Sequence, residues 1–396
     1  MLISPIRITA YTLTNALGSG VDASLHALQS RQSGLRPCNF QDVTLSTWIG
    51  RVDGIEEQSL LATLSRFECR NNRLAYLALQ ADDFCEQINE AVNRYGANRI
   101  GVFMGTSTSG IGATEEAYRH RDEDGELSND FQPTTTHVIY SITDFVRNYL
   151  QLKGVALTVS TACSSSAKVF ATAQRYLEAG LCDAAIVGGV DTLCLTTLYG
   201  FNSLDLVSSD RCKPWDTNRN GINIGEGAGF ALLEREQAGG DGARLLGYGE
   251  SSDAYHMSTP HPQGMGAALA MQQALAQVAI SADEVGYINL HGTATPTNDA
   301  AEDAAVMQVF GDKTPCSSTK GWTGHTLGAA GVIEAIFTLM ALENGLLPCS
   351  LNTEQRDEAL SANVLLENKQ QNITYAMSNS FGFGGNNCSL LFGRDL

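Results

Sequence analysis

One cysteine in this sequence stands among side chains small enough to let a substrate approach it. Cys163 lies in the motif T-A-C-S-S-S-A at 161–167, and residues 164–178 have the small-residue pattern of a buried helix. Unpaired N–H groups and the dipole at a helix N-terminus favour the thiolate, which is the nucleophilic form of cysteine. Cys163 is therefore a candidate nucleophile, with a buried structural cysteine as the alternative. Ser164 and Ser165 are poorer candidates, because no G-x-S-x-G elbow surrounds them.

Two histidines are placed in a similar way, next to runs of small residues. His291 begins the motif H-G-T-A-T-P at 291–296, directly after an apolar run. His325 ends the motif T-K-G-W-T-G-H and precedes a Gly- and Ala-rich helix, with Lys320 five residues before it. A histidine held at the end of a strand beside glycines faces open space, whereas a lone histidine is more often a satisfied core or surface residue. The other histidines, which lack such surroundings, are at positions 26, 120, 137, 256 and 261.

A third motif, N-S-F-G-F-G-G-N-N at 379–387, is dense in glycine. Such density usually makes a tight turn. The functional alternative is a turn whose backbone N–H groups point at a developing oxyanion. No nucleotide site is predicted, because the sequence has no Walker A pattern and G-E-G-A-G at 225–229 is not a G-x-G-x-x-G fingerprint.

Short apolar runs alternate with longer small-residue patterns along the chain, which is typical of an α/β fold. The predicted strands are 100–104, 156–160, 184–187, 230–233, 287–290 and 389–392. The predicted helices are 73–92, 164–178, 266–278, 299–310 and 331–343, and residues 239–242 are the one plausible boundary between domains. At both Cys163 and His325 a strand delivers a reactive side chain to the start of a buried helix, which indicates a duplicated α/β unit.

The composition indicates a compact protein that does not bind nucleic acid. Of 396 residues, 43% are hydrophobic, as in a compact protein. The formal net charge is −18, whereas binding to nucleic-acid phosphates needs a basic face. The same negative charge disfavours binding to an anionic membrane surface. The ten cysteines form no C-x-x-C pair, so reduced thiols in a cytoplasmic protein are expected instead of disulfides or a zinc site. The sequence opens on no basic and apolar leader, and we expect no apolar run of the roughly 18 residues that a membrane span needs.

Together the motifs resemble those of the elongating β-ketoacyl-acyl-carrier-protein synthases of the thiolase superfamily. The resemblance covers nearly the whole chain and includes K-P-W-D at 213–216, G-E-G-A-G at 225–229 and S-S-D-A-Y-H at 251–256. Each motif alone is weak, but their joint order is very specific. His325 stands where the initiating type of synthase carries asparagine, so the resemblance is to the type with two active-site histidines.

The resemblance implies a five-layered αβαβα fold built from two duplicated halves. The N-terminal half, 1–243, would carry the nucleophile, and the C-terminal half, 244–396, would carry the two histidines and the lysine. It also implies an obligate dimer, either of identical chains or with a second ketosynthase-like subunit. The substrates would arrive on the phosphopantetheine arm of an acyl carrier protein, with no metal and no further cofactor.

The implied reaction is a decarboxylative Claisen condensation that extends an acyl chain by two carbons in fatty acid biosynthesis. Cys163 would take the acyl group, with the backbone N–H groups of Cys163 and Phe383 holding the oxyanion. Neutral His291 and His325 would donate to the enolate that forms when malonyl thioester loses carbon dioxide. Lys320 would polarise this pair with support from Glu334, and a structural ion pair is the alternative role for Lys320.

Family positions also suggest residues that select and receive the substrate. Phe383 would be the gate between the acyl and malonyl pockets, and Thr108 stands where long-chain members carry a bulky residue, although ordinary loop variation explains Thr108 equally well. The substrate-binding candidates are Thr108, Thr293, Thr295 and Phe383. Whether His137 and Tyr140 also shape the pocket stays open.

Basic residues at two places are candidates for docking the acidic carrier protein. One cluster is Arg66, Arg70 and Arg73, and the other is the pair Arg211 and Lys213. A local basic patch attracts an acidic partner even when the whole chain is acidic. A solvated helix face is the usual alternative for such clusters.

Several residues depart from the pattern of the fatty-acid members. Lys168 replaces a histidine, Thr143 and Asp144 stand where small residues are usual, and Asn386 replaces a threonine. A ketosynthase of a dedicated type II polyketide or aryl-polyene pathway, working with a chain-length-factor partner, is therefore the second interpretation.

Three other classes fit the sequence less well. A non-catalytic chain-length factor lacks the cysteine. A thiolase needs a second cysteine at the glycine-rich turn, and Cys388 lies just past it. A cysteine hydrolase has no use for Lys320 and two paired histidines.

Overall fold

Strands of two halves join into one mixed sheet in the computed structural model, which describes residues 4–235, 242–278 and 280–394. The strand order is β6-β5-β7-β9-β1 and then β10-β16-β15-β11-β12, with β2 (Gly18–Ser19) pairing β1 off this path. The first half consists of β1 (Ile6–Asn15), β5 (Ile100–Gly105), β6 (Ala156–Val159), β7 (Ala184–Asp191) and β9 (Gly227–Arg235). The second consists of β10 (Arg244–Ser252), β11 (Val285–Asn289), β12 (Cys316–Ser317), β15 (Tyr375–Gly382) and β16 (Asn386–Gly393).

The strand order shows that the second half repeats the first. In each half the third strand along the chain (β6 or β12) lies at the outer edge, followed by the second, the fourth and the fifth. The first strand of each half lies at the junction, where β1 and β10 pair only over Ile6–Arg7. The duplicated α/β unit expected from the sequence is therefore confirmed, and the exact division after residue 243 stays a prediction.

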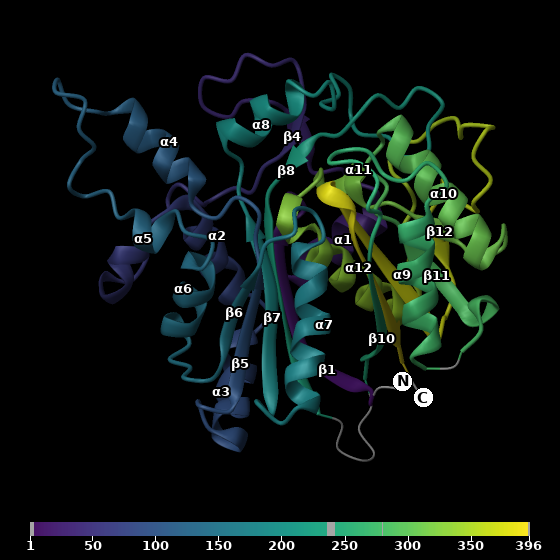
Figure 1. The fold of residues 1–396 in the computed structure, drawn as a ribbon, viewed down its shortest axis with the longest axis horizontal. Helices are drawn as coiled ribbons and strands as arrows, with labels where there is room; N and C mark the ends of the chain where they lie inside the picture. Colours follow the sequence, from purple (N-terminus) through teal and green to yellow (C-terminus); the bar gives the residue numbers. More distant parts are fainter. Residues whose placement is uncertain (1–3, 236–241, 279, 395–396) are drawn as a thin grey trace.

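Helices lie between and outside the two halves of the sheet and give five layers (Figure 1). The central layer is α7 (Ser165–Glu178) against α12 (Ala330–Asn344). One outer layer contains α2 (Arg70–Leu79), α3 (Phe84–Tyr95) and α6 (Ser141–Tyr149), and the other contains α9 (Met265–Ala276) and α10 (Pro296–Phe310). This αβαβα arrangement confirms the predicted fold class.

The remaining elements are short and lie mostly in the connections. The helices are α1 (Val21–Ser30), α4 (Ile111–Arg119), α5 (Pro133–Thr136), α8 (Leu195–Asn202) and α11 (Lys320–Thr323). The 3₁₀ turns are η1 (Ala62–Phe67), η2 (Ala282–Glu284), η3 (Leu327–Ala329) and η4 (Phe383–Gly385). The small strands are β3 (Leu35–Pro37), β4 (Trp48–Gly50), β8 (Ile224–Gly225), β13 (Leu346–Leu347) and β14 (Lys369–Gln370).

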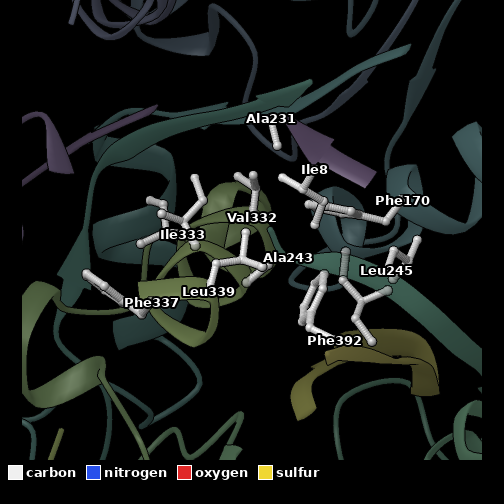
Figure 2. Close-up of a cluster of buried hydrophobic side chains, with 14 of the residues drawn as sticks. Ile8, Phe170, Ala231, Ala243, Leu245, Val332, Ile333, Phe337, Leu339 and Phe392 are labelled. Carbon is white, nitrogen blue, oxygen red and sulfur yellow. The ribbon is translucent and has the colours of Figure 1, made fainter. Parts of the chain in front are cut away.

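The two central helices approach closely because small residues line their contact. A Cβ atom on Gly331 of α12 would lie 2.4 Å from the backbone nitrogen of Ala167 on α7, so no larger residue fits there. Around this contact the sheets and α12 bury a common apolar cluster, which includes Phe170, Val332 and Phe392 (Figure 2). The core thus fixes the start of α7, which follows Cys163, against the start of α12, which follows His325.

One predicted helix is wrong in its extent. The pattern at 73–92 predicts a single helix, but α2 ends at Leu79 and α3 begins at Phe84. Asp82 and Asp83 between them have positive φ angles of 56° and 54°. The Asp82 carboxylate accepts hydrogen bonds from the Thr12 hydroxyl and the Val21 amide, so tertiary contacts favour a turn here.

One described segment passes the length and composition test for a membrane span. Residues Leu327–Asn344 are long and apolar enough to cross a membrane, but 89% of this window is buried inside the protein. Its apolar character belongs to the core helix α12. Of the predicted boundary 239–242, residues 239–241 lie outside the described residues.

Candidate active site

Cys163 is presented by a strained turn between a strand and a helix. Strand β6 ends at Val159 and α7 begins at Ser165, so the side chain lies just before the helix N-terminus. Ala162 has a left-handed φ of 52°, which is costly for a residue with a Cβ atom and is typical of functional turns. Cys163 is only 6% exposed and lines a cavity described below.

Burial raises the pKa of the Cys163 thiol to about 11, although the Lys320 ammonium and the Phe383 amide both lower it. The resting group is therefore a thiol at neutral pH. The helix N-terminus does not dominate as the sequence suggested, because the cost of burying a charged sulfur is larger.

The raised pKa predicts how Cys163 reacts with iodoacetamide. Below its pKa the thiolate fraction rises tenfold per pH unit, so we expect the alkylation rate at Cys163 to rise about tenfold per unit between pH 7 and pH 9. Peptide mass spectrometry after timed quenching would give the rate. A rate that levels off below pH 8 would contradict the raised pKa.

His325 meets Cys163 from the other half of the protein. Its Nε2 lies 3.0 Å from the Cys163 Sγ, and the Leu327 amide donates to its Nδ1 at 3.2 Å. Because Nδ1 accepts a hydrogen bond, the neutral ring carries its proton on Nε2, which faces the sulfur. The turn after His325 is anchored to the N-terminal half, where the buried Asp191 accepts the Gly328 amide at 2.6 Å.

His291 is held beside His325 by groups on three segments. The two rings are 5.5 Å apart between centroids and nearly perpendicular. The Lys320 Nζ donates to the His291 carbonyl oxygen, lies 3.4 Å from its Nδ1 and pairs with Glu334 at 2.5 Å. The Glu302 carboxylate accepts the His291 and Gly292 amides, each at 2.8 Å. Because the Lys320 ammonium can only donate, the His291 Nδ1 accepts, and the ring proton is on Nε2, as in His325.

Burial and the Lys320 ammonium lower the pKa of both histidines well below 6.5, so both rings are neutral at physiological pH. Burial raises the pKa of Glu334 to about 7 against the opposing effect of Lys320. Burial also raises the pKa of Glu302 to about 8. Two neutral N–H donors beside a fixed ammonium suit a site where negative charge develops on a substrate.

Cys163, His291 and His325 line one cavity. Thr293, Thr295 and Phe383 line it, as do Phe201, Leu206, Ser258 and Asn298. The rings of Phe383 and Phe201, which both line the cavity, are 5.5 Å apart between centroids. The cavity therefore brings together the predicted nucleophile, both histidines and three of the four substrate-binding candidates.

The fourth substrate-binding candidate lies outside the lining of this cavity. The Thr108 hydroxyl donates to the buried Asp191 at 2.8 Å. His137 and Tyr140 do not line it either, and the His137 Nδ1 lies 2.6 Å from the Thr114 hydroxyl. The Thr108 hydroxyl thus hydrogen-bonds to the Asp191 carboxylate.

Arg70, one of the predicted docking residues, is engaged by carboxylates of its own chain. Its guanidinium forms ion pairs with Glu226 and Glu56, and the Glu226 side chain is fully buried. The other candidates are less constrained: Arg66 packs over Phe67, Arg211 packs over Trp48, and Lys213 lies 3.9 Å from Asp210. Arg73, from the same cluster, pairs with Glu68.

Replacing Arg70 should therefore change stability and leave partner binding alone. Glu226 also accepts the Val52 and Leu193 amides at 2.9 Å, so Arg70→Ala leaves a buried carboxylate without its cation. Removing one partner of a buried pair typically costs about 3–5 kcal/mol. We expect a loss of this size in urea unfolding. An unchanged midpoint, with weaker carrier binding, would restore the docking role.

The Cys163, His291 and His325 ligand atoms lie within 4.8 Å of one another, a spacing that could hold a metal ion. The donor set fits such an ion poorly. Both Nε2 atoms carry protons in the tautomers described above, and the Lys320 ammonium repels a second cation at this point.

Two acidic residues at this site were missed in the sequence. Glu302 holds the backbone of the His291 turn, and Asp191 accepts from Thr106, Ser107, Thr108 and Gly328. The available signal was an acidic residue within a small-residue run, as in G-G-V-D at 188–191. The pattern does not reveal which distant amides such a carboxylate will meet.

Comparison with known proteins agrees with the geometry. Residues 4–238 match the description "Beta-ketoacyl synthase, N-terminal domain", and residues 242–354 match "Beta-ketoacyl synthase, C-terminal domain". The chain belongs to the β-ketoacyl synthase family. Within this family, a 3-oxoacyl-[acyl-carrier-protein] synthase 2 of Vibrio cholerae is 33% identical over 98% of this chain and 99% of its own. A synthase 1 of Haemophilus influenzae is 32% identical over 98% of each chain.

Solved structures of the family superpose closely. A chain of the complex between a ketosynthase (ApeO) and its chain length factor (ApeC) from Xenorhabdus doucetiae is 40% identical, with a TM-score of 0.90 over 99% of this chain and 98% of that one. A β-ketoacyl synthase from Burkholderia phymatum is 28% identical, with a TM-score of 0.89 over the full length of both chains. The resemblance inferred from the motifs is confirmed.

Proposed function

We propose that this chain catalyses the decarboxylative condensation of an acyl thioester with malonyl-acyl-carrier protein, giving a β-ketoacyl-acyl-carrier protein. The observation that carries the proposal is that the Cys163 thiol and two neutral histidines lie together in the lining of one cavity. A nucleophile splits the reaction into an acyl transfer and a condensation. The N–H groups of the two histidines stabilise the enolate anion that forms before the condensation.

In the first half-reaction the Cys163 sulfur attacks the carbonyl carbon of the acyl thioester. The His325 Nε2–H, 3.0 Å from Sγ, stabilises the sulfur as it becomes a thiolate. The amides of Phe383 and Cys163 receive the oxyanion. The carbon–sulfur bond to the carrier breaks, and the proton of Cys163 ends on the departing carrier thiol.

In the second half-reaction the malonyl thioester loses carbon dioxide. The electron pair of the broken carbon–carbon bond forms an enolate, whose oxygen accepts the Nε2–H groups of His291 and His325. The enolate carbon attacks the acyl-Cys163 carbonyl and expels the cysteine sulfur as a thiolate, which takes up a proton from water to restore the resting thiol. Lys320, paired with Glu334 in the buried interior, fixes the His291 tautomer and adds positive charge near the enolate.

The proposed reaction uses no metal and no cofactor other than the phosphopantetheine of the carrier. Charge on the enolate is offset by neutral donors and the Lys320 ammonium, so a Lewis acid has no task to perform. Thr293 and Thr295 line the cavity, where their hydroxyls meet at 2.9 Å and can receive the amide groups of the pantetheine arm. We infer that the enzyme works as a soluble cytoplasmic protein.

A dedicated pathway with a chain-length-factor partner is the second candidate. A chain of a ketosynthase–chain length factor complex is 40% identical to this protein over 99% of its length, and this likeness supports the second candidate. The edge strand β6 also has an exposed leucine, Leu157, and the segment 138–140 that precedes α6 has three exposed apolar side chains. Such an edge suits pairing with a second ketosynthase-like chain, identical or not.

The test is acylation followed by extension. Purified protein would be incubated with carrier proteins bearing different acyl chains, and intact mass would report acylation of Cys163. Malonyl-carrier protein is then added, and the β-ketoacyl product is measured. Acylation with two-carbon extension supports the proposal, and the preferred chain separates the two pathways. No acylation with any chain would overturn it.

A further inference from the structure

One buried carboxylate close to the active site is held by neutral groups alone. Asp191 is the last residue of β7 and is fully buried. Among the described residues, its two oxygens accept hydrogen bonds from N–H and O–H groups and pair with no Lys or Arg side chain. Burying a charge without a counter-ion is costly, so the position of this carboxylate calls for an explanation.

The donors to Asp191 come from both halves of the protein. In the loop after β5, the Thr106 hydroxyl donates at 2.6 Å and the Ser107 amide at 2.9 Å. From the other half, the Gly328 amide donates to Asp191 at 2.6 Å and more weakly, at 3.2 Å, to the Ser107 hydroxyl. Gly328 belongs to η3 and lies three residues after His325. Asp191 therefore ties the turn that follows His325 to the N-terminal half.

The turn held in this way is strained. Leu327, which precedes Gly328, has a left-handed φ of 56°. A residue with a Cβ atom keeps such a conformation only where its surroundings fix it. The Leu327 amide is also the group that donates to the His325 Nδ1, at 3.2 Å. The direction of this N–H bond thus depends on where the next residue, Gly328, is held.

We propose that Asp191 is a positioning residue for His325. By holding Gly328 it aims the Leu327 N–H at Nδ1, which keeps the ring proton on Nε2, facing the Cys163 sulfur. Without this donor the proton can reside on either nitrogen, and a ring protonated on Nδ1 has no N–H for the sulfur or the enolate. The inference rests on the proposed function for its effect on the reaction, but the tautomer can be measured without turnover.

Packing is the alternative cause of the position of this turn. The Leu327 side chain is buried in an apolar cluster with Leu193 and Ile222. If this cluster alone fixes the turn, loss of the carboxylate lowers stability and leaves the tautomer unchanged.

Asparagine at position 191 separates the two cases, because it keeps the shape of the side chain. The Asp191 Oδ1 accepts from the amide and hydroxyl of Thr108 and from the Thr106 hydroxyl. The amide oxygen of asparagine is expected to take this place, since it can only accept. Its NH2 group then faces the Gly328 amide, which donates to Oδ2 in the wild type. Two donors repel each other, so the turn loses its anchor.

The experiment is 15N NMR of protein labelled at its seven histidines, because protonated and unprotonated ring nitrogens give distinct signals. The signals that disappear in His325→Ala belong to His325. We expect a single Nε2–H tautomer in the wild type and a mixture of tautomers in Asp191→Asn. In the same variant kcat for condensation should fall roughly 10–100-fold, less than on loss of the donor itself. KM for the acyl carrier should change little.

Gly328→Ala tests the same contact from the other side, and it replaces Asp191→Asn if that variant folds poorly. Its Cβ atom would lie 2.6 Å from an Asp191 oxygen and push the turn away from an intact carboxylate, so we expect the same change in the His325 signals. The matched control is Thr106→Val, which removes another hydrogen bond of Asp191 and keeps the Gly328 contact. It should lower the free energy of unfolding without changing the His325 tautomer.

The outcomes separate the two proposals. A single Nε2–H tautomer in both Asp191→Asn and Gly328→Ala would overturn the positioning role and assign the turn to packing. A mixed tautomer in Thr106→Val as well would show a general loosening of the site and would also overturn it. A wild-type protein that takes up no acyl group would overturn the proposed function, while the comparison of tautomers would still decide the role of Asp191.

Discussion

Replacing Cys163 with alanine is expected to lower the condensation rate by a factor of about 10⁴ or more, since loss of a nucleophile removes the covalent route entirely. Malonyl decarboxylation should persist in the variant, because the two Nε2–H donors that hold the enolate do not need the sulfur. Intact mass would show no acyl-enzyme, while carbon dioxide release continues. Loss of both half-reactions together would contradict the division of roles.

Cys182→Ala is the matched control for this experiment. Cys182 is buried, and burial raises the pKa of its thiol to about 11, as for Cys163. It lies beyond the opposite end of α7, outside the cavity. Its replacement should leave acylation and extension near the wild-type rates. Acyl transfer that depends on Cys182 would move the nucleophile elsewhere.

Replacing His291 with alanine is expected to separate the two half-reactions. In the proposed reaction His291 donates to the enolate, whereas the hydrogen-bond contact to the sulfur comes from His325. The decarboxylation rate of the variant should therefore fall roughly 10²–10³-fold, the usual cost of one oxyanion donor. Acylation of Cys163 should fall far less. Quenched single-turnover measurements give the two rates: acylation with the acyl-carrier protein alone, and decarboxylation with the malonyl-carrier protein alone.

His325→Ala supplies the contrast. His325 lies 3.0 Å from the Cys163 Sγ as well as beside His291, so its loss should slow both half-reactions. Thermal unfolding of each variant shows whether either change acts through stability. Equal effects of the two histidine variants on acylation would contradict the assignment of His325 to the sulfur.

The comparison of fold and sequence shows which features are local. The strand and helix that flank Cys163 were predictable, since a short apolar run followed by small residues specifies both. The turn at Asp82 and Asp83 was not, because it depends on Thr12 and Val21, which are remote in sequence. The apolar periodicity of the sequence does not predict such a contact.

The candidate site also has features that depend on local sequence and features that depend on distant contacts. Residue type and neighbours mark Cys163, His291, His325 and Lys320 as a chemical set, because each lies in a motif of small residues that leaves room for a substrate. The family pattern adds Phe383. These motifs are short and continuous in the chain, so the sequence alone determined which residues could do the chemistry. It also determined the α/β class.

The tertiary structure decided the state in which these groups work. Burial overrides the helix N-terminus and raises the pKa of Cys163, and contacts from Leu327 and Lys320 set the histidine tautomers. The same structure pairs Arg70 with the buried Glu226 carboxylate. Desolvation and hydrogen bonding between distant segments produce these effects, and both exist only once the two halves of the chain have packed together.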